Sequence, residues 1–308
     1  MTTNMHALPR LRDSLSYHYI EQAIVERNQN AIETIQDSGR TLIPAAAVSL
    51  ILLGPGTSIS HAAVKVLMEN GCSILWTGEQ GMRCYAQGIG ETHRGYHLSR
   101  QAEMVCDPAK HEMVVRKMYQ YRFAVTLEPG LSLAQIRGME GGRIKKAYAE
   151  ASAKYGVAWQ GRKYDRFDWS YSDKINRTLS AANALLNGIC HAGILAGGYS
   201  PALGFIHTGR MLSFVYDIAD LYKTEITIPA AFETAAENPA NPEAKVREKC
   251  RERFMETKLL QRIVNDIDNL LEISDDESGR EDTDPPSELW EELFRDVCDD
   301  TGKSANRT

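Results

Sequence analysis

Three residues that are suited to bind hard metal ions stand in three short motifs of this chain. Glu140 lies in RGMEG (137–141), His207 in GFIHTG (204–209), and Asp220 ends YDIAD (216–220). Carboxylate oxygens and imidazole nitrogens are suitable ligands for Mg²⁺ or Mn²⁺. A divalent ion neutralises the charge that grows on the oxygens during a phosphodiester reaction. If folding brings the three side chains together, the sequence predicts a metal-dependent phosphodiester enzyme.

The surroundings of these residues both support and weaken the prediction. Asp217 and Asp220 are three apart on a predicted helix, so they share a face. Such pairs near a lysine are common on helix surfaces, but this helix is strongly apolar, and its carboxylates need partners. A lone histidine after two apolar residues is more often structural than catalytic. Glu140 precedes Gly141 and Gly142, and each glycine costs a helix about 1 kcal/mol relative to alanine. That cost suggests the close approach of another backbone or of a ligand.

The charge distribution favours a nucleic acid as substrate. The net charge is −6, but residues 272–308 hold 13 acidic and 4 basic residues, a net of −9, so residues 1–271 carry +3. Residues 137–177 are rich in lysine and arginine, which indicates either a phosphate-binding surface or a solvated helix face. The candidate phosphate ligands near the motifs are Arg137, Arg143, Arg210 and Lys223, and the candidate stacking faces for unpaired bases are Tyr164, Trp169 and Tyr216.

The elements that must position these residues change in character near Gly88-Ile89-Gly90. Before that point, short β-prone runs surround one helix, predicted for His61–Glu69 with Ser60 as its N-cap. After it, the apolar period is about 3.6. The strands are predicted at 19–25, 31–35, 41–43, 48–53, 72–76 and 82–86, and the later helices at 97–105, 111–123, 133–154, 172–196, 212–223 and 242–271.

These patterns predict an α+β protein in three parts. Residues 1–90 form a small β-rich N-terminal domain, residues 91–271 a larger α-helical catalytic domain, and residues 272–308 an acidic, flexible tail. An apolar stripe in the tail at helical spacing suggests a segment that docks on a partner. Its members are Leu289, Trp290, Leu293, Phe294 and Val297.

Other classes find little support. The six cysteines are scattered without a Cys-x-x-Cys pair, which argues against zinc and against a disulfide framework. We find no uninterrupted apolar run of about 18 residues and no apolar signal-peptide core at the start. We therefore expect a cytoplasmic protein with reduced thiols and no membrane contact.

Together, five segments resemble the Cas-one (Cas1) family of CRISPR-associated integrases, and their residues are most similar to those of the subtype I-E branch. The segments run in the family's order from about residue 11 to 260 and are highly specific as a set. They are GTSISHAAV (56–64), RGMEG (137–141), GRKYD (161–165), GFIHTG (204–209) and LSFVYDIAD (212–220).

The resemblance implies both an activity and an assembly. Glu140, His207 and Asp220 would bind Mg²⁺ or Mn²⁺, with Asp217 beside them as a further catalytic residue. The implied reaction is CRISPR adaptation, in which the 3′-hydroxyl of a double-stranded prespacer attacks a phosphodiester of CRISPR repeat DNA. Metal-dependent endonuclease hydrolysis is the related reaction. The implied assembly is a homodimer, with two such dimers around a dimer of the Cas-two protein (Cas2).

The resemblance also implies DNA contacts. Tyr164, Trp169, Arg210 and Tyr216 would surround the prespacer 3′ overhang. Further basic residues would follow the duplex backbone: Lys65, Arg83, Arg40, Arg247 and Arg251. The chain departs from the family at three positions: Gln22, Ser58 and Asn187. Gln22 aligns near the family tyrosine that wedges the duplex fork.

Two other functions stay open at this point. A general repair nuclease for branched DNA would use the same metal site. A DNA-binding scaffold that has lost catalysis would keep the carboxylates as structural residues. Manganese-dependent cleavage of branched DNA separates the scaffold from the enzymes.

Overall fold

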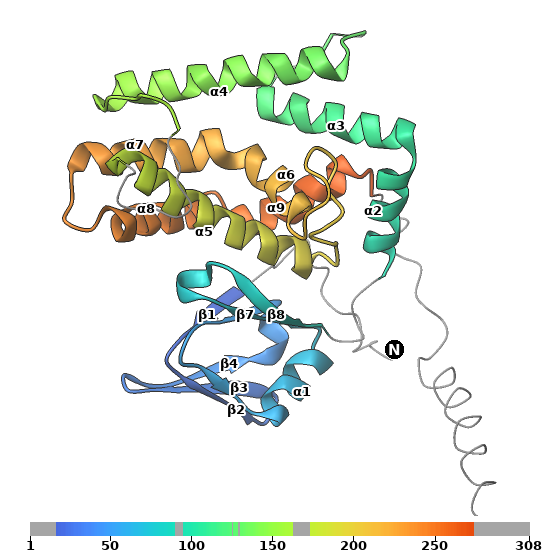
Figure 1. Ribbon diagram of the computed structural model, residues 1–308. Helices are drawn as coiled ribbons and strands as arrows, with labels where there is room; N and C mark the ends of the chain where they lie inside the picture. The colour runs from blue at the N-terminus through green and yellow to red at the C-terminus, as the bar shows by residue number, and fades with distance from the viewer. Residues whose placement is uncertain (1–16, 90–94, 125, 129, 163–172, 274–308) are drawn as a thin grey trace, which may run out of the picture. The chain divides into compact units, whose positions relative to one another are not determined.

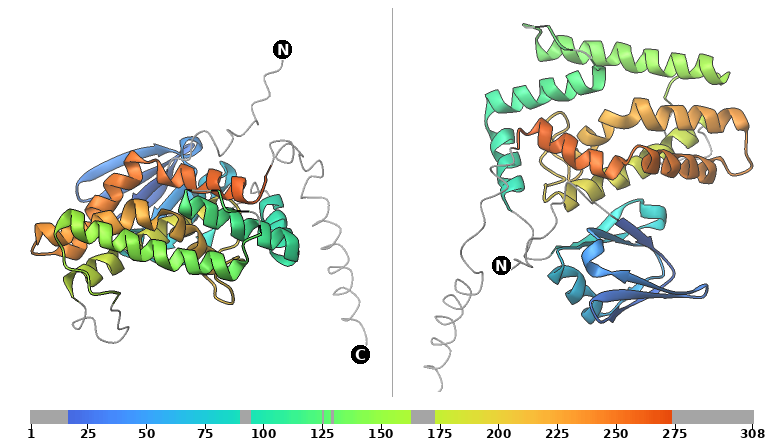
Figure 2. Two further views of the ribbon diagram at one scale, coloured as in Figure 1. Left: turned by 90° about the horizontal axis from the view of Figure 1, so that it is seen from above. Right: turned by 180° about the vertical axis from the view of Figure 1, so that it is seen from behind.

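A computed structural model describes residues 17–89, 95–124, 126–128, 130–162 and 173–273. The strands, with one helix among them, come first along the chain, and the other α-helices follow (Figures 1 and 2). This order confirms the predicted α+β class. The tail stripe, Tyr164 and Trp169 lie outside the described residues.

The β-rich region contains two four-stranded sheets. In the first, β1 (Tyr17–Ile20), β5 (Leu50–Leu53) and β7 (Ser73–Thr77) are parallel, and β8 (Cys84–Gly88) pairs antiparallel with β7. In the second, β4 (Gly39–Pro44), β3 (Ala31–Gln36) and β2 (Ile24–Asn28) are antiparallel, and β6 (Ser58–Ile59) runs parallel to β2.

Apolar patterning explains this region. The four residues of β5 are all buried, as expected for a strand covered on both faces. The helix α1 (His61–Glu69) begins where predicted, because the Ser60 hydroxyl accepts a hydrogen bond from the Ala63 amide. Its Val66 and Leu67 are buried in one core with Ile51 and Ile74. The single strand predicted at 19–25 was wrong: Gln22 has a φ of 51°, and the chain turns there between β1 and β2.

The helical region surrounds α5 (Lys174–Ala196), which contacts α6, α7, α8 and α9. By length and composition alone α5 could cross a membrane, but 67% of its apolar window is buried inside the structure. That burial is typical of a core helix. The other helices are α2 (Tyr96–Cys106), α3 (Pro108–Phe123), α4 (Leu133–Tyr155), α6 (Ser213–Tyr222), a π-helical turn (Lys223–Thr227), α7 (Ile228–Glu237), α8 (Pro242–Glu256) and α9 (Leu259–Leu270).

Local capping fixes the two helices that lead into the site. α3 starts at Pro108 behind the N-cap Asp107, and its C-cap is Ala124, which is left-handed with a φ of 50°. α4 starts with a capping box between Ser132 and Gln135, and its C-cap is the left-handed Gly156.

Two helix predictions were wrong. The sequence predicted one helix over 242–271, but Lys258 is left-handed with a φ of 48° and separates α8 from α9. The helix α7 was not predicted. It directly continues the π-helical turn after α6, so no loop signal marks its start, and Pro229 occupies a tolerated position in its first turn.

Candidate active site

Three helices bring Glu140 and Asp220 to one cation. Arg122, at the end of α3, donates from Nη1 to the Oε1 of Glu140 on α4 and from Nη2 to the Oδ2 of Asp220 on α6, the latter over 2.7 Å. The guanidinium side chain is only 6% exposed. The two carboxylates predicted as metal ligands therefore lie on either side of one buried positive group.

A second cation contacts Asp220. The ammonium of Lys223, one helical turn further on, pairs with its Oδ1. Burial raises the pKa of Asp220, but Lys223 and Arg122 lower it more, so the net pKa lies below its usual value. Asp220 is therefore an anion at neutral pH. Lys223, predicted to bind DNA, is a carboxylate partner in this structure.

Asp217 holds the loop that carries His207. This carboxylate is fully buried. Its Oδ2 accepts hydrogen bonds from the amides of Phe205 at 2.6 Å and Ile206 at 3.0 Å. Its Oδ1 accepts from the His207 amide at 2.9 Å and from the His207 ring Nδ1 at 2.7 Å. Asp217 thus fixes both the backbone and the ring of the predicted metal-binding histidine.

The same contact sets the chemistry of the imidazole. The carboxylate already accepts from three backbone amides, so the ring Nδ1–H is the donor in this contact, and in the neutral imidazole Nε2 then carries the lone pair. The hydrogen bond that the ring donates to Asp217 raises the pKa of His207, against the opposing effect of burial, and Asp220 adds a smaller electrostatic increase. The side chain is 44% exposed. A histidine oriented by a carboxylate in this way is typical of metal ligands.

These side chains fit a hard divalent ion. Glu140 and Asp220 supply oxygens, and His207 supplies an oriented nitrogen. The fit is one of donor type alone, because within the described ranges no group of three or more His, Cys, Asp or Glu side chains is arranged so that it could hold a metal ion. Arg122 instead occupies the position of a cation between the carboxylates. The metal ligands Glu140, His207 and Asp220 stay a prediction.

Arg122 and Asp266 are site residues that sequence reasoning missed. Asp266, on α9, accepts hydrogen bonds at its Oδ2 from the hydroxyls of Tyr121 and Tyr222, both at 2.7 Å. Tyr121 precedes Arg122, and Tyr222 follows Asp220 by two residues. Burial raises the pKa of Tyr222 well above its usual value, so its hydroxyl stays protonated and donates. Asp266 thereby joins α3 to α6 behind the site.

Replacing Asp266 by alanine should lower the free energy of unfolding by about 1–3 kcal/mol, because the buried Tyr222 hydroxyl loses its acceptor. The matched control is Tyr121→Phe, which should cost less, since Tyr121 is 37% exposed and water can replace the bond. Urea denaturation measures both. Equal stability of Asp266→Ala and the wild type would contradict the role given to Asp266.

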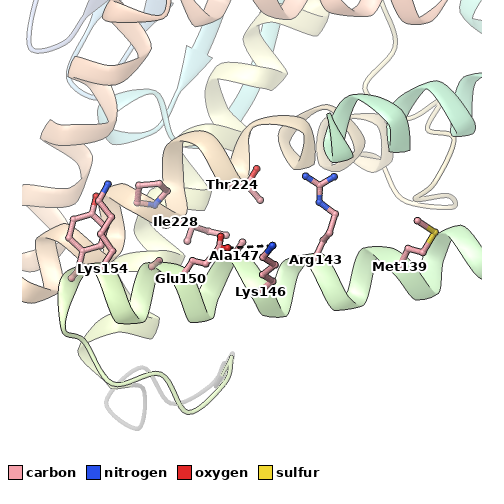
Figure 3. Close-up of a pocket in the computed structure, with 11 residues that line it drawn as sticks. Met139, Arg143, Lys146, Ala147, Glu150, Lys154, Thr224 and Ile228 are labelled. Atoms are coloured by element: carbon pink, nitrogen blue, oxygen red, sulfur yellow. Dashed lines mark ion pairs between the residues drawn. The ribbon is translucent and has the colours of Figure 1, made fainter. Parts of the chain in front are cut away.

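A groove follows α4 away from Glu140. Its volume is about 710 Å³, and it begins at Met139 and Arg143. Figure 3 places its cationic side chains Arg143, Lys146 and Lys154 on the side of α4 that faces Thr224 and Ile228. Glu140 and Arg143 are three apart, so they lie on one face of the helix. A basic groove that starts at a candidate active site suits a polyanionic strand.

The glycines around Glu140 face open space. A Cβ built on Gly138, Gly141 or Gly142 meets no atom within 4 Å. Of the two explanations offered by the sequence, close approach of another backbone is therefore wrong within the described chain. Close approach of a ligand stays a prediction.

The other predicted DNA contacts lie on several elements. Arg210 is exposed in the loop after His207, and the Tyr216 ring lies edge-on to the His207 ring at 5.9 Å between centroids. Arg137 is exposed on α4. In the β-rich region, Lys65 is on α1, Arg83 precedes β8, and Arg40 on β4 pairs with Glu33 at 3.6 Å. Arg247 and Arg251 are on α8.

Comparison with known proteins identifies one family. The family model described as "CRISPR associated protein Cas1" matches residues 121–268, which include Arg122, Glu140, His207 and Asp220. The chain is 48% identical over 292 residues to a protein of Thermus thermophilus named CRISPR-associated endonuclease Cas1 2, covering 94% of this chain and 90% of that one. It is 43% identical over 286 residues to CRISPR-associated endonuclease Cas1 of a Clostridium species, covering 92% and 94%.

A solved structure described as "Crystal structure of TtCas1-DNA complex" superimposes with a TM-score of 0.77 and 49% identity, covering 87% of this chain and 100% of that one. An N-terminal β-sheet region followed by a helical domain is thus the Cas1 fold. The chain belongs to the Cas1 family of CRISPR-associated proteins. Subtype I-E stays a prediction, because the similar proteins come from varied organisms.

Proposed function

We propose that this protein is the metal-dependent DNA endonuclease and integrase of CRISPR adaptation. The observation that carries the proposal is the convergence of Glu140 and Asp220 beside a histidine that buried Asp217 orients. The names of the relatives support the endonuclease, and the similar structure of a TtCas1-DNA complex supports DNA as the substrate.

The roles follow from the contacts. Glu140 and Asp220 would hold a divalent ion through oxygens and His207 through Nε2. When bound, Mg²⁺ or Mn²⁺ neutralises charge on the phosphodiester and lowers the pKa of a water or hydroxyl. Asp217 acts as a positioning residue, because its oxygens are occupied by the loop 205–207. Arg210, exposed beside the site, is placed to bind a phosphate oxygen.

The groove on α4 is the proposed path of a DNA strand. Replacing Arg143 by glutamine should weaken DNA binding and slow DNA cleavage, because the groove loses a cation that can pair with a backbone phosphate. Lys145→Gln is the matched control, since Lys145 is exposed on α4 but does not line the groove. DNA binding and cleavage rates at several salt concentrations are the measurements. Equal losses from both variants, or no loss from Arg143→Gln, would exclude the groove as the path of the strand.

The reaction we propose is attack of a prespacer 3′-hydroxyl on a phosphodiester of the CRISPR repeat, with hydrolysis when water replaces the hydroxyl. The proposed partner is Cas2, bound between two dimers of this chain. The apolar stripe at 289–297 is the proposed docking segment.

Deleting residues 274–308 should therefore weaken co-purification with Cas2. The deletion removes the apolar stripe, while the described residues, which end at 273, are all retained. Pull-down at matched concentrations measures the effect. Undiminished assembly by the shortened chain would rule out the tail as a docking segment.

The test of the function uses the purified chain and a branched DNA substrate. Cleavage should need Mn²⁺ or Mg²⁺ and stop on chelation by EDTA, and addition of Cas2 and a repeat-containing plasmid should convert hydrolysis into strand joining. Binding without cleavage in any divalent ion would favour the scaffold instead. Cleavage without strand joining, in the presence of Cas2, would favour a repair nuclease.

A further inference from the structure

The buried guanidinium of Arg122 stands where the proposed function needs a metal ion. It bridges Glu140 and Asp220, which come from helices other than its own. Two carboxylates that contact the same guanidinium group repel each other, and the positive charge between them offsets that repulsion. Arg122 supplies that cation from within the chain, so the carboxylates can converge before any ion binds.

The hydrogen-bond donors of the guanidinium group are not all satisfied by the described residues. Its Nε is among the buried side-chain nitrogens for which the described residues provide no hydrogen-bond partner. A buried donor without a partner is costly, and this cost lowers the net stability of the bridged arrangement. The contact with the two carboxylates is therefore favourable enough to form, yet weaker than a fully satisfied buried pair.

Arg122 also contacts an aromatic ring on its own helix. It is the next-to-last residue of α3, and the chain leaves the helix two residues later at the left-handed Ala124. Its guanidinium carbon already lies 5.6 Å from the centre of the Tyr119 ring, within the range of a cation–π contact. This second favourable contact lowers the cost to the guanidinium of giving up the carboxylates.

We propose that Arg122 is a tethered counter-cation that competes with the divalent ion for Glu140 and Asp220. In the metal-free protein it pairs with both carboxylates, and the ion must displace it from them. The inference rests on the proposed function, because it takes the two carboxylates as metal ligands. It adds that this chain weakens its own metal affinity in exchange for a preformed site.

The experiment measures Mn²⁺ affinity of the full chain without DNA, from the electron paramagnetic resonance signal of free Mn²⁺ during titration. Arg122→Gln should bind Mn²⁺ at least about fivefold more tightly than the wild type, the lower end of usual coupling between sites. Arg122→Lys keeps the charge but not the forked geometry, so its affinity should lie between the two. Arg122→Lys also tests the competition if Arg122→Gln fails to fold.

Lys223→Gln is the matched control, because Lys223 contacts Asp220 alone. It should strengthen Mn²⁺ binding less than Arg122→Gln. An equal gain from both variants would indicate a general charge effect and overturn the competition, as would unchanged or weaker binding by both Arg122 variants. Glu140→Ala distinguishes failure of the competition from failure of the metal site. If it leaves wild-type Mn²⁺ binding intact, the metal site itself, and with it the proposed function, is wrong.

Thermal unfolding gives an independent readout. Without metal, Arg122→Gln should melt at a lower temperature than the wild type, since the carboxylates lose their counter-charge. Saturating Mn²⁺ should raise its melting temperature by more than it raises that of the wild type, because tighter binding to the folded state stabilises more. A smaller rise than in the wild type would contradict the proposal.

Discussion

Metal-dependent DNA cleavage should fall at least about a thousandfold when Asp220 is replaced by alanine, and similarly when His207 is. Each tenfold loss corresponds to about 1.4 kcal/mol, and a bound ion contributes several kcal/mol of charge stabilisation to the transition state. Asp220→Ala would remove an oxygen ligand and His207→Ala the oriented nitrogen. DNA binding should largely survive in both variants, because the proposed phosphate contacts lie on other residues.

Both variants need a check on folding and a control. Asp220 pairs with Arg122 and Lys223, so Asp220→Asn, which keeps the side-chain volume, separates lost chemistry from lost packing. Circular dichroism verifies the fold, and a mobility-shift assay verifies DNA binding. Glu256→Ala, an exposed carboxylate at the end of α8, is the matched control and should cleave normally. Retained cleavage by His207→Ala and Asp220→Ala would end the assignment of the active site.

Replacing Asp217 by alanine should lower the free energy of unfolding by about 3–5 kcal/mol, the usual cost of removing one member of a buried charged network. Four hydrogen bonds end on this one carboxylate, three of them from consecutive backbone amides. Without it, the loop 205–207 loses its anchor and His207 loses the partner that fixes its ring. Cleavage should therefore fall as well, although the Asp217 side chain is fully buried.

The contrast with His207→Ala makes this prediction specific. His207 is 44% exposed, so its truncation should change stability by about 1 kcal/mol or less. Urea denaturation of both variants should thus separate a positioning residue, which stabilises the fold, from a metal ligand, which serves only chemistry. Asp217→Ala that unfolds at the same urea concentration as His207→Ala would refute the division of roles.

Local patterns predicted most of the elements of this fold. The Ser60 cap, the fully apolar run of β5 and the 3.6-residue period of the later helices each depend on neighbours in sequence. The prediction failed where a residue has a backbone conformation that is uncommon for its type. Gln22 and Lys258 are left-handed, although neither is a glycine or an asparagine.

The sequence by itself placed Glu140, His207, Asp217 and Asp220 in recognisable motifs, because the residues of a motif and their helical spacing are local properties. Only the tertiary structure decided what these residues touch. Arg122 reaches partners 18 and 98 residues away, and Asp266 joins side chains 145 and 44 residues away. Spacing put Asp217 on the face of Asp220, yet its carboxylate binds backbone amides of the preceding loop. Such contacts form between distant segments, and periodicity along one helix carries no information about them.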